Sequence, residues 1–151
     1  MSEQTMQGFQ ILPGVSRREL CRREDARGWL LKLLMREHIG GPLDFGEIYV
    51  TAATAGQVKG NHFHEKAREW FCVLQGRALM AVQVMASGES AQVELSADAP
   101  AIVEVAPGVA HAFRNSGSET MLLLAYADDP YNAAAPDEQR VVLLEPDAAA
   151  R

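Results

Sequence analysis

Short apolar runs alternate with turn-forming residues along most of the chain. The breaks between them contain Gly or Pro, as at Gln75-Gly76, Ser87-Gly88 and Pro107-Gly108. Short strands at a spacing of roughly ten residues, with Gly or Pro at the joins, are typical of a β-sandwich or β-barrel. No window before the C-terminal tail has a sustained helical period, so the pattern predicts an all-β domain. The predicted strands are residues 29–35, 45–52, 69–74, 78–84, 91–95, 101–105 and 121–127.

The two ends of the chain differ from this pattern. Residues 1–24 have weak periodicity, and we interpret them as an N-terminal arm. Residues 25–144 form the predicted domain, and residues 145–151 form a C-terminal tail of loop or short helix. A chain of 151 residues suits one domain and is too short for two ordinary ones.

Composition narrows the class of protein. Hydrophobic residues make up 48% and charged residues 23%, which are globular proportions. The 20 acidic residues outweigh the 14 basic ones and give a net charge of −6, so nucleic acid and anionic membrane are poor partners. The longest apolar runs, such as Met121–Ala127, are too short to span a bilayer.

The sequence also predicts a cytoplasmic location. The N-terminus lacks a basic stretch followed by an apolar one, so we expect no signal peptide. Cys21 and Cys72 are far apart and form no CxxC motif. We therefore expect two free thiols in a reducing compartment.

Three of the four histidines stand where they can share a site with a carboxylate. His62 and His64 are two residues apart, so on a strand they point to the same face. Glu69 begins the next apolar run, and His111 follows the Pro107-Gly108 turn. Three imidazoles and one carboxylate suit a divalent transition metal, with room for water or substrate. An isolated His-x-His pair, by contrast, is more often an ordinary surface or core pair.

The spacing around these residues supports the metal interpretation. The first motif of the cupin superfamily is reproduced by Gly56, His62, His64, Glu69 and Gly76, with five, one, four and six residues between them. The run from Pro107 to His111, followed by Asn115, resembles the second motif. Ala106 and Pro100 stand where that motif often has Pro and Gly, which affects local turns but removes no ligand. The chain therefore resembles the cupins.

This resemblance implies a fold. Cupins are jelly-roll barrels, or double-stranded β-helices, in which two antiparallel sheets enclose the metal. On that model Phe71 and Val73 share the inward face with Glu69, because alternate residues of a strand point to the same side. Trp70, Cys72 and Leu74 then face outward.

Finer features resemble one group of cupins. The phrase Asp25-Ala26-Arg27-Gly28, the run Lys59–His64 and the segment Asp128–Asn132 resemble the sugar-nucleotide cupins. They are similar to the C-terminal cupin domain of bifunctional capsular-polysaccharide epimerase/reductases and, more distantly, to dTDP-4-dehydrorhamnose 3,5-epimerase. The resemblance implies an isomerase that epimerises or isomerises a nucleotide-linked 4-keto-6-deoxy sugar in bacterial polysaccharide biosynthesis. The chain has no GxGxxG strand-turn-helix, so any reduction belongs to another protein.

The resemblance also suggests roles for single residues. His62 is either a metal ligand or the base that removes a proton beside the keto group, since one nitrogen cannot do both. Tyr126 is the candidate acid, with Tyr131 as second choice, although Tyr126 could equally be a rim residue. Lys59 and Arg114 are candidates for binding a diphosphate or an enolate oxygen, or are plain surface charges.

Several alternatives stay open. The same ligands suit zinc, iron, manganese or nickel. An iron or manganese dioxygenase acting on a small organic substrate is a second hypothesis, and a non-catalytic ligand-binding cupin is a third, because the fold alone does not fix function. Cupins of this kind commonly pair through N-terminal strands, so we also expect a homodimer.

Overall fold

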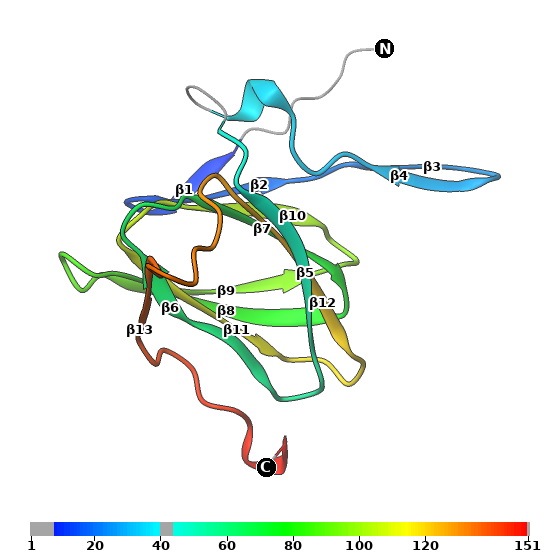
Figure 1. Ribbon diagram of the computed structural model, residues 1–151. Coiled ribbons are helices and arrows are strands. Elements are labelled where there is room, and N and C mark those ends of the chain that lie inside the picture. The colour runs from blue at the N-terminus through cyan, green and yellow to red at the C-terminus, as the bar shows by residue number, and fades with distance from the viewer. Residues whose placement is uncertain (1–7, 40–43, 151) are drawn as a thin grey trace.

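Two antiparallel sheets face each other in the computed structural model, which describes residues 8–39 and 44–150 (Figure 1). The six-stranded sheet contains, in spatial order, β1 (Phe9–Leu12), β2 (Val15–Glu19), β10 (Ala101–Val105), β7 (Glu69–Gln75), β12 (Met121–Ala127) and β5 (Glu47–Ala53). The five-stranded sheet contains β13 (Glu138–Arg140), β6 (Val58–His64), β11 (Val109–Asn115), β8 (Arg77–Val84) and β9 (Ser90–Ser96). This architecture confirms the predicted all-β barrel.

The predicted strand positions agree well with the structure in the centre of the chain. Six of the seven predicted runs coincide with β5, β7, β8, β9, β10 and β12 to within two residues at each end. The run 29–35 is the exception, because only its first part is a strand, β4 (Gly28–Leu31). Leu33 and Leu34 leave the strand and pack against the outer face of the six-stranded sheet.

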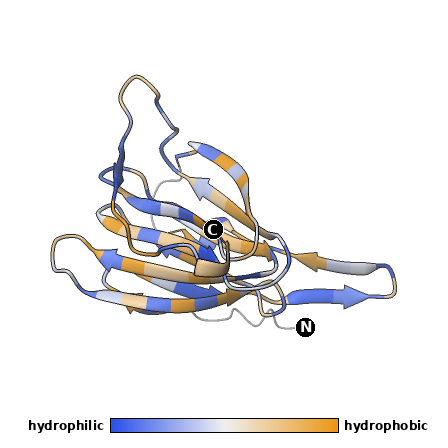
Figure 2. Cartoon of the chain, turned by 90° about the horizontal axis from the view of Figure 1, so that it is seen from below, coloured by the Kyte–Doolittle hydropathy of each residue, from blue (hydrophilic) through white to orange (hydrophobic). Residues whose placement is uncertain are grey.

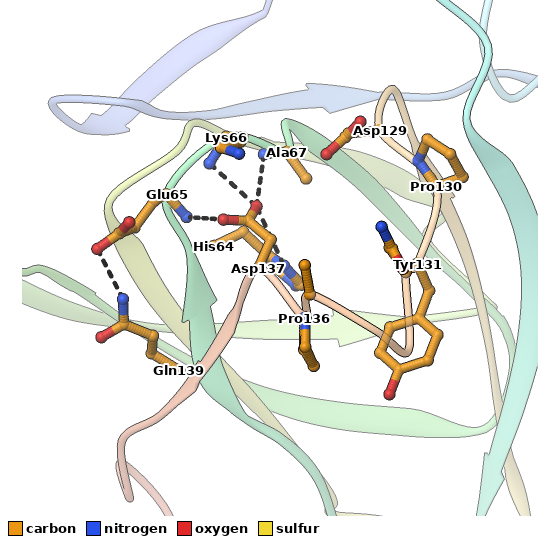
Figure 3. A pocket seen from close by; sticks show the side chains of 12 residues that line it. His64, Glu65, Lys66, Ala67, Asp129, Pro130, Tyr131, Pro136, Asp137 and Gln139 are labelled. Carbon is orange, nitrogen blue, oxygen red and sulfur yellow. Dashed lines mark hydrogen bonds and ion pairs between the residues drawn. The ribbon is translucent and has the colours of Figure 1, made fainter.

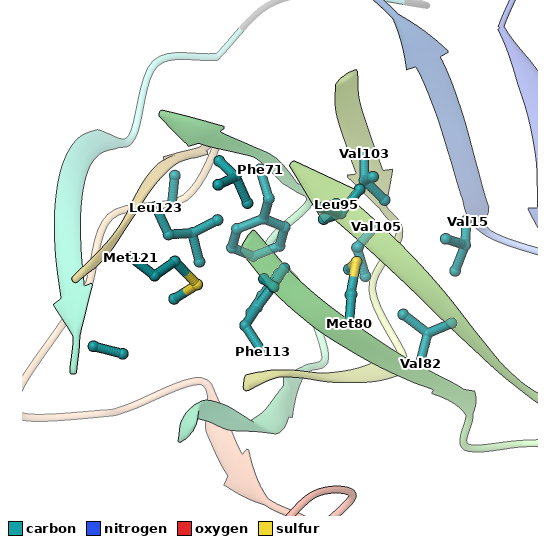
Figure 4. Close-up of a cluster of buried hydrophobic side chains, with 14 of the residues drawn as sticks. Val15, Phe71, Met80, Val82, Leu95, Val103, Val105, Phe113, Met121 and Leu123 are labelled. Atoms are coloured by element: carbon teal, nitrogen blue, oxygen red, sulfur yellow. The ribbon is translucent and has the colours of Figure 1, made fainter. Parts of the chain in front are cut away.

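The main core lies between the sheets, where alternate residues of each strand point inward. Phe71 and Val73 of β7 belong to it, as predicted. Phe71 meets Phe113 of β11 across the interior, with ring centroids 4.8 Å apart (Figure 4). Burying a side chain of this size contributes about 1.5–3 kcal/mol. Trp70 points the other way and packs with Ile102 on the outer face.

The predicted N-terminal arm is not separate from the barrel, and this corrects the assignment of residues 1–24. β2 pairs with β10 from Val15 to Glu19, and Val15 is buried in the main core. The arm therefore supplies two strands of the larger sheet over its described part, while residues 1–7 lie outside the described residues. The boundary at residue 25 falls inside a hairpin formed by β3 (Arg22–Asp25) and β4.

That hairpin projects from the barrel (Figures 1 and 2). Its two strands form a sheet of their own. β3 has the hydrophilic sequence RRED, whereas β4 has the apolar sequence GWLL. Trp29 and Leu30 are 61% and 54% exposed. The hairpin thus presents large apolar side chains to solvent, away from the barrel's own core.

The C-terminal segment packs along the outside of the five-stranded sheet. Leu144 is buried against Ala81 and Ala112 of that sheet. The Asn61 side chain accepts hydrogen bonds from the backbone N–H groups of Leu143 and Leu144 and donates to the Leu144 carbonyl oxygen, at 2.8, 3.1 and 2.9 Å. The end of the chain is therefore fixed to β6, the strand that carries two of the candidate site histidines.

Helical structure in the described ranges consists of two short 3-10 helices, η1 (Arg36–His38) and η2 (Ala148–Ala150). The second lies in the predicted C-terminal tail. Over residues 8–39 and 44–150, no helix has the length and apolar character needed to cross a membrane.

Candidate functional site

Four side chains predicted from the motif spacing lie together inside the barrel. His62 and His64 come from β6, His111 from the neighbouring strand β11, and Glu69 from β7 in the opposite sheet. One potential ligand atom from each lies within 4.8 Å of the others. The cluster therefore joins the two sheets at one point.

A β-bulge in β6 sets the positions of the histidines. His62 pairs with His111, but Gly60 pairs with Ala112, so Asn61 is the extra residue. Asn61 and Gly60 both have positive φ, 62° and 86°. A Cβ atom at Gly60 would lie 2.9 Å from the His111 carbonyl oxygen, so glycine permits the close approach of the two strands. The bulge leaves the His62 and His111 rings edge to face, with centroids 4.8 Å apart.

Glu69 connects the histidines across the site. Its Oε1 lies 3.1 Å from His64 Nε2 and 3.3 Å from His111 Nε2. Glu69 is only 2% exposed, and burial alone would raise its pKa. The interactions with His111 and His64 outweigh burial and hold the pKa of Glu69 below its usual range. The carboxyl group is therefore ionised, as a metal ligand must be.

Two buried atoms of the cluster lack hydrogen-bond partners in the described part of the chain, as the ligand atoms of a metal ion would in its absence. Among the described residues, Glu69 Oε1 and His111 Nε2 are buried and have no partner with hydrogen-bond geometry. Buried polar atoms without partners are rare and call for an explanation. A carboxylate oxygen within 3.3 Å of two imidazole nitrogens is a set of donors that a divalent transition metal uses.

In each of the three clustered histidines, the ring nitrogen Nδ1 faces a protein oxygen atom. His62 Nδ1 lies 2.5 Å from Glu138 Oε1, and His111 Nδ1 lies 3.2 Å from the Val109 carbonyl oxygen. His64 Nδ1 lies 3.8 Å from an Asp137 oxygen. Such outer contacts fix ring orientation and leave Nε2 as the available nitrogen. Glu138 was not predicted from the sequence, because it meets His62 only through the pairing of β13 with β6.

His62 and His64 have different charge preferences although they share a strand. Burial, followed by repulsion from His111, lowers the pKa of His62. Burial also lowers that of His64, but Glu69, Asp137 and Glu138 outweigh it, so the pKa of His64 is raised. His62 is thus the more readily neutral of the two and has a lone pair available near pH 7.

Tyr49 is a further residue beside the cluster that was not predicted from the sequence. It lies on β5 opposite Ala125, and its hydroxyl group donates a hydrogen bond of 3.5 Å to Glu69 Oε2. Burial, followed by the charge of Glu69, raises the pKa of Tyr49, so its hydroxyl stays protonated at ordinary pH. The predicted strand 45–52 contained the signal, since period-two alternation places Tyr49 on the same face as the buried Ala53.

A pocket of about 510 Å³ lies beside His64, between the turn that follows β6 and the loop that follows β12 (Figure 3). Its lining includes Lys66, Asp129, Tyr131 and Asn132. The side chains around it are mainly hydrogen-bonding groups, which suits a polar ligand.

Two aspartates attach that loop to the turn. Asp137 accepts hydrogen bonds from the backbone N–H groups of Glu65, Lys66 and Ala67 at 3.1, 3.0 and 3.1 Å. Asp128 accepts one from the Arg68 N–H group at 2.8 Å. Both ends of the loop carrying Tyr131 are therefore fixed to the segment that joins His64 to Glu69.

Tyr126 does not reach the histidines, which corrects its assignment as the candidate acid. It pairs with Trp70, whereas Ala127 pairs with Glu69, so Tyr126 faces the outside of the sheet. Its ring stacks on Trp70 with centroids 5.0 Å apart, and its hydroxyl group donates to the Asp44 carbonyl oxygen at 2.7 Å. The side chain acts in packing.

The two predicted substrate-binding cations have different positions. Arg114 contacts the C-terminal segment, with Nε 3.4 Å from Asp147 Oδ1 and Nη1 donating to the Glu145 carbonyl oxygen. An odd spacing from His111 places it on the outer face of its sheet, so the structure does not bring it to the site. Lys59 is exposed, two positions along the ladder from the His62–His111 pair.

Comparisons with known proteins agree with this geometry. A family described as "Polysaccharide biosynthesis C-terminal domain" matches residues 23–139. The spore coat polysaccharide biosynthesis protein SpsL of Bacillus subtilis is 25% identical over 87% of this chain and 89% of its own length. A UDP-2-acetamido-2,6-beta-L-arabino-hexul-4-ose reductase of Pseudomonas aeruginosa is 26% identical over 75% of this chain, which spans only 29% of that enzyme.

A solved structure shares the fold. It is a double mutant of ChmJ, a 3'-monoepimerase from Streptomyces bikiniensis, in complex with dTDP. It superposes with a TM-score of 0.80 at 17% identity, over 91% of this chain and 73% of that one.

Proposed function

Since the chain belongs to the polysaccharide biosynthesis C-terminal domain family, we propose that it is a metal-containing epimerase or isomerase of a nucleotide-linked 4-keto-6-deoxy sugar. The convergence of three histidines and a glutamate inside the barrel carries the proposal. The names of the relatives support the substrate class, because one acts on a UDP-linked sugar and another is an epimerase that binds dTDP.

His64, Glu69 and His111 are the residues that we expect to hold the ion. One Glu69 oxygen faces both Nε2 atoms, and the three groups match the two-histidine, one-carboxylate set of a catalytic zinc site with an open position. The same set suits iron, manganese or nickel. When bound, the ion supplies a positive charge that polarises a carbonyl oxygen.

His62 is the proposed base. Its strongest polar contact is with Glu138, outside the group formed by Glu69, His64 and His111. Glu138 holds the proton on Nδ1, so Nε2 has the lone pair that can remove a proton from the carbon beside a ketone. On this assignment the two roles of His62 do not compete, because we propose that the three other residues hold the metal.

Tyr131 is the proposed acid, in place of Tyr126. Epimerisation needs a second group that returns a proton from the opposite face of the sugar. Tyr131 and His64 line the same pocket (Figure 3). We propose that the sugar enters this pocket and that Lys59 contributes to holding the diphosphate.

The decisive experiment follows the metal and the proton separately. Protein purified without chelators is analysed for bound metal and incubated in D2O with a nucleotide-linked 4-keto-6-deoxy sugar. We expect about one zinc, iron, manganese or nickel ion per chain and deuterium beside the keto group. His62→Gln should keep the metal but slow exchange by about 10²- to 10⁴-fold, the usual contribution of a general base. His64→Gln should lose the metal.

The outcomes separate the parts of the proposal. Loss of metal in His62→Gln would make His62 a ligand and move the base elsewhere. Absence of deuterium exchange in the metal-loaded wild type, with every nucleotide-linked keto sugar offered, would reject the epimerase. Oxygen uptake instead of exchange would favour a dioxygenase, and binding without turnover would favour a ligand-binding cupin.

We also propose a cytoplasmic homodimer. The exposed Trp29 and Leu30 of the projecting hairpin are apolar surface that a second copy would cover. Two free cysteines suit a reducing compartment. A solution mass equal to that of one chain would reject the dimer.

A further inference from the structure

Tyr49 approaches the metal-ligand cluster from a strand that carries none of the four ligands. β5 is the edge strand of the six-stranded sheet, next to β12. In register, Tyr49 stands opposite Ala125, which in turn stands opposite Phe71 of β7. Both neighbours belong to the main core, so Tyr49 is on the inner face of the sheet, where its place on the edge strand leaves it 37% exposed. The Tyr49 hydroxyl group reaches across β12 to Glu69 on β7.

The two oxygens of Glu69 have separate partners. Oε1 faces His64 Nε2 and His111 Nε2, while Oε2 faces the Tyr49 hydroxyl group. A carboxylate on a side chain with three torsions can rotate, and rotation would exchange the oxygen that faces the histidines. A donor on one oxygen favours one orientation of the group.

We propose that Tyr49 is a positioning residue for the metal centre: its hydroxyl group holds Glu69 with Oε1 directed at His64 and His111. This inference rests on the proposed function, because it assumes that Glu69 is a metal ligand. Hydrogen bonds to ligating side chains typically change metal affinity by about 10- to 100-fold. The 3.5 Å contact is long for a charge-assisted hydrogen bond, so we expect the lower end of that range.

Tyr126 provides a matched control. It is one residue further along the neighbouring strand, and its hydroxyl group makes a shorter hydrogen bond, 2.7 Å, to a backbone oxygen. It lies on the outer face of the sheet, against Trp70. Tyr126→Phe therefore removes the same atom and a better hydrogen bond without changing a contact of Glu69.

The test measures metal affinity in the full chain. Metal-free wild type, Tyr49→Phe and Tyr126→Phe are titrated with Co²⁺, whose visible spectrum reports ligand geometry, and Co²⁺ is then displaced with Zn²⁺. We expect Tyr49→Phe to bind both ions about tenfold more weakly and to change the Co²⁺ spectrum. Tyr126→Phe should match the wild type in affinity and spectrum.

A double substitution tests whether Tyr49 acts through Glu69. In a Glu69→Gln background, Tyr49→Phe should have no further effect on the remaining Co²⁺ affinity, because the group that it positions is gone. Equal effects in both backgrounds, or equal affinities of wild type and Tyr49→Phe, would overturn the inference and leave the metal centre intact. Failure of the wild type to bind Co²⁺ or Zn²⁺ would instead reject the metal centre and this inference with it.

Discussion

Tyr49 and Tyr126 lie on neighbouring strands of one sheet, yet they face opposite sides of it. Tyr49 reaches Glu69 inside the barrel. Tyr126 stacks on Trp70 outside and donates to a backbone oxygen. The two residues have the same chemistry, so strand phase alone decides which belongs to the candidate site. In this sheet, a shift of one residue separates a side chain that contacts the histidine–glutamate cluster from one that packs on the outer face.

The two faces also differ in what they require of their residues. The inner face at Glu69 is a buried polar centre whose ionisable groups have shifted pKa values. The outer face at Trp70 and Tyr126 is an apolar cluster covered by residues such as Leu33. Substitutions on the outer face should therefore change stability, and substitutions on the inner face should change metal binding and proton transfer.

The largest expected effect comes from Trp70→Ala on the outer face. The side chain is 2% exposed, and loss of a buried Trp destabilises a domain by about 3–5 kcal/mol through lost burial and the cavity left behind. Urea unfolding would measure this loss, while metal content per folded chain should stay at the wild-type value. Glu69→Gln, one residue away, should instead weaken metal binding, so that metal content per folded chain falls while stability changes less. Loss of metal from folded Trp70→Ala would show that the two faces are not independent.

The second-largest expected effect comes from Tyr131→Phe, because Tyr131 lines the pocket beside His64 and Tyr126 does not. Tyr131→Phe should slow formation of the inverted sugar by about 10²-fold or more while metal content is unchanged, because the proposed donor to the opposite face is removed. Tyr126→Phe should leave the rate of inversion near the wild-type value. Slow inversion by Tyr126→Phe, with normal inversion by Tyr131→Phe, would reverse the assignment of the acid.

The strand pattern and motif spacing predicted most of the fold and the four clustered residues. Glycine turns and apolar runs located six strands, because those signals are local in the sequence. They did not predict β6 or β11, the two strands that carry the clustered histidines. His62, His64 and Glu69 lie close together in the chain, so their spacing was sufficient to suggest that they converge.

The errors have physical causes that local patterns do not contain. The strand MLLLAYA is apolar at every position because both faces of the sheet are covered, so its sequence does not show that Tyr126 faces outward. The contact of Glu138 with His62 depends on the pairing of β13 with β6, which is long-range. Arg114 is different: its odd spacing from His111 could have placed it on the opposite face.

The smallest expected effect concerns Asp137, a carboxylate at the rim that is held by backbone groups. Burial raises its pKa, but hydrogen bonds from the N–H groups of Ala67, Lys66 and Glu65 outweigh this, so the pKa of Asp137 is lowered from its ordinary value of 3.8. A lowered folded-state pKa means that the carboxylate contributes stability above pH ~4 and that this is lost as the pH falls through the folded value. Asp137→Asn should therefore reduce the free energy of unfolding at pH 7 by about 1 kcal/mol.

The pH dependence of the free energy of unfolding tests whether the charge of Asp137 causes this loss of stability. The difference between wild type and Asp137→Asn should become smaller at low pH than at pH 7, because the carboxyl group then gains a proton and is neutral like the amide. Asp129→Asn is the matched control, because it removes the same charge from the same pocket without touching the N–H groups of residues 65–67. If Asp137→Asn loses the same free energy at both pH values, the amide disturbs the turn by its shape, and the ionised carboxylate is not what holds the loop beside His64.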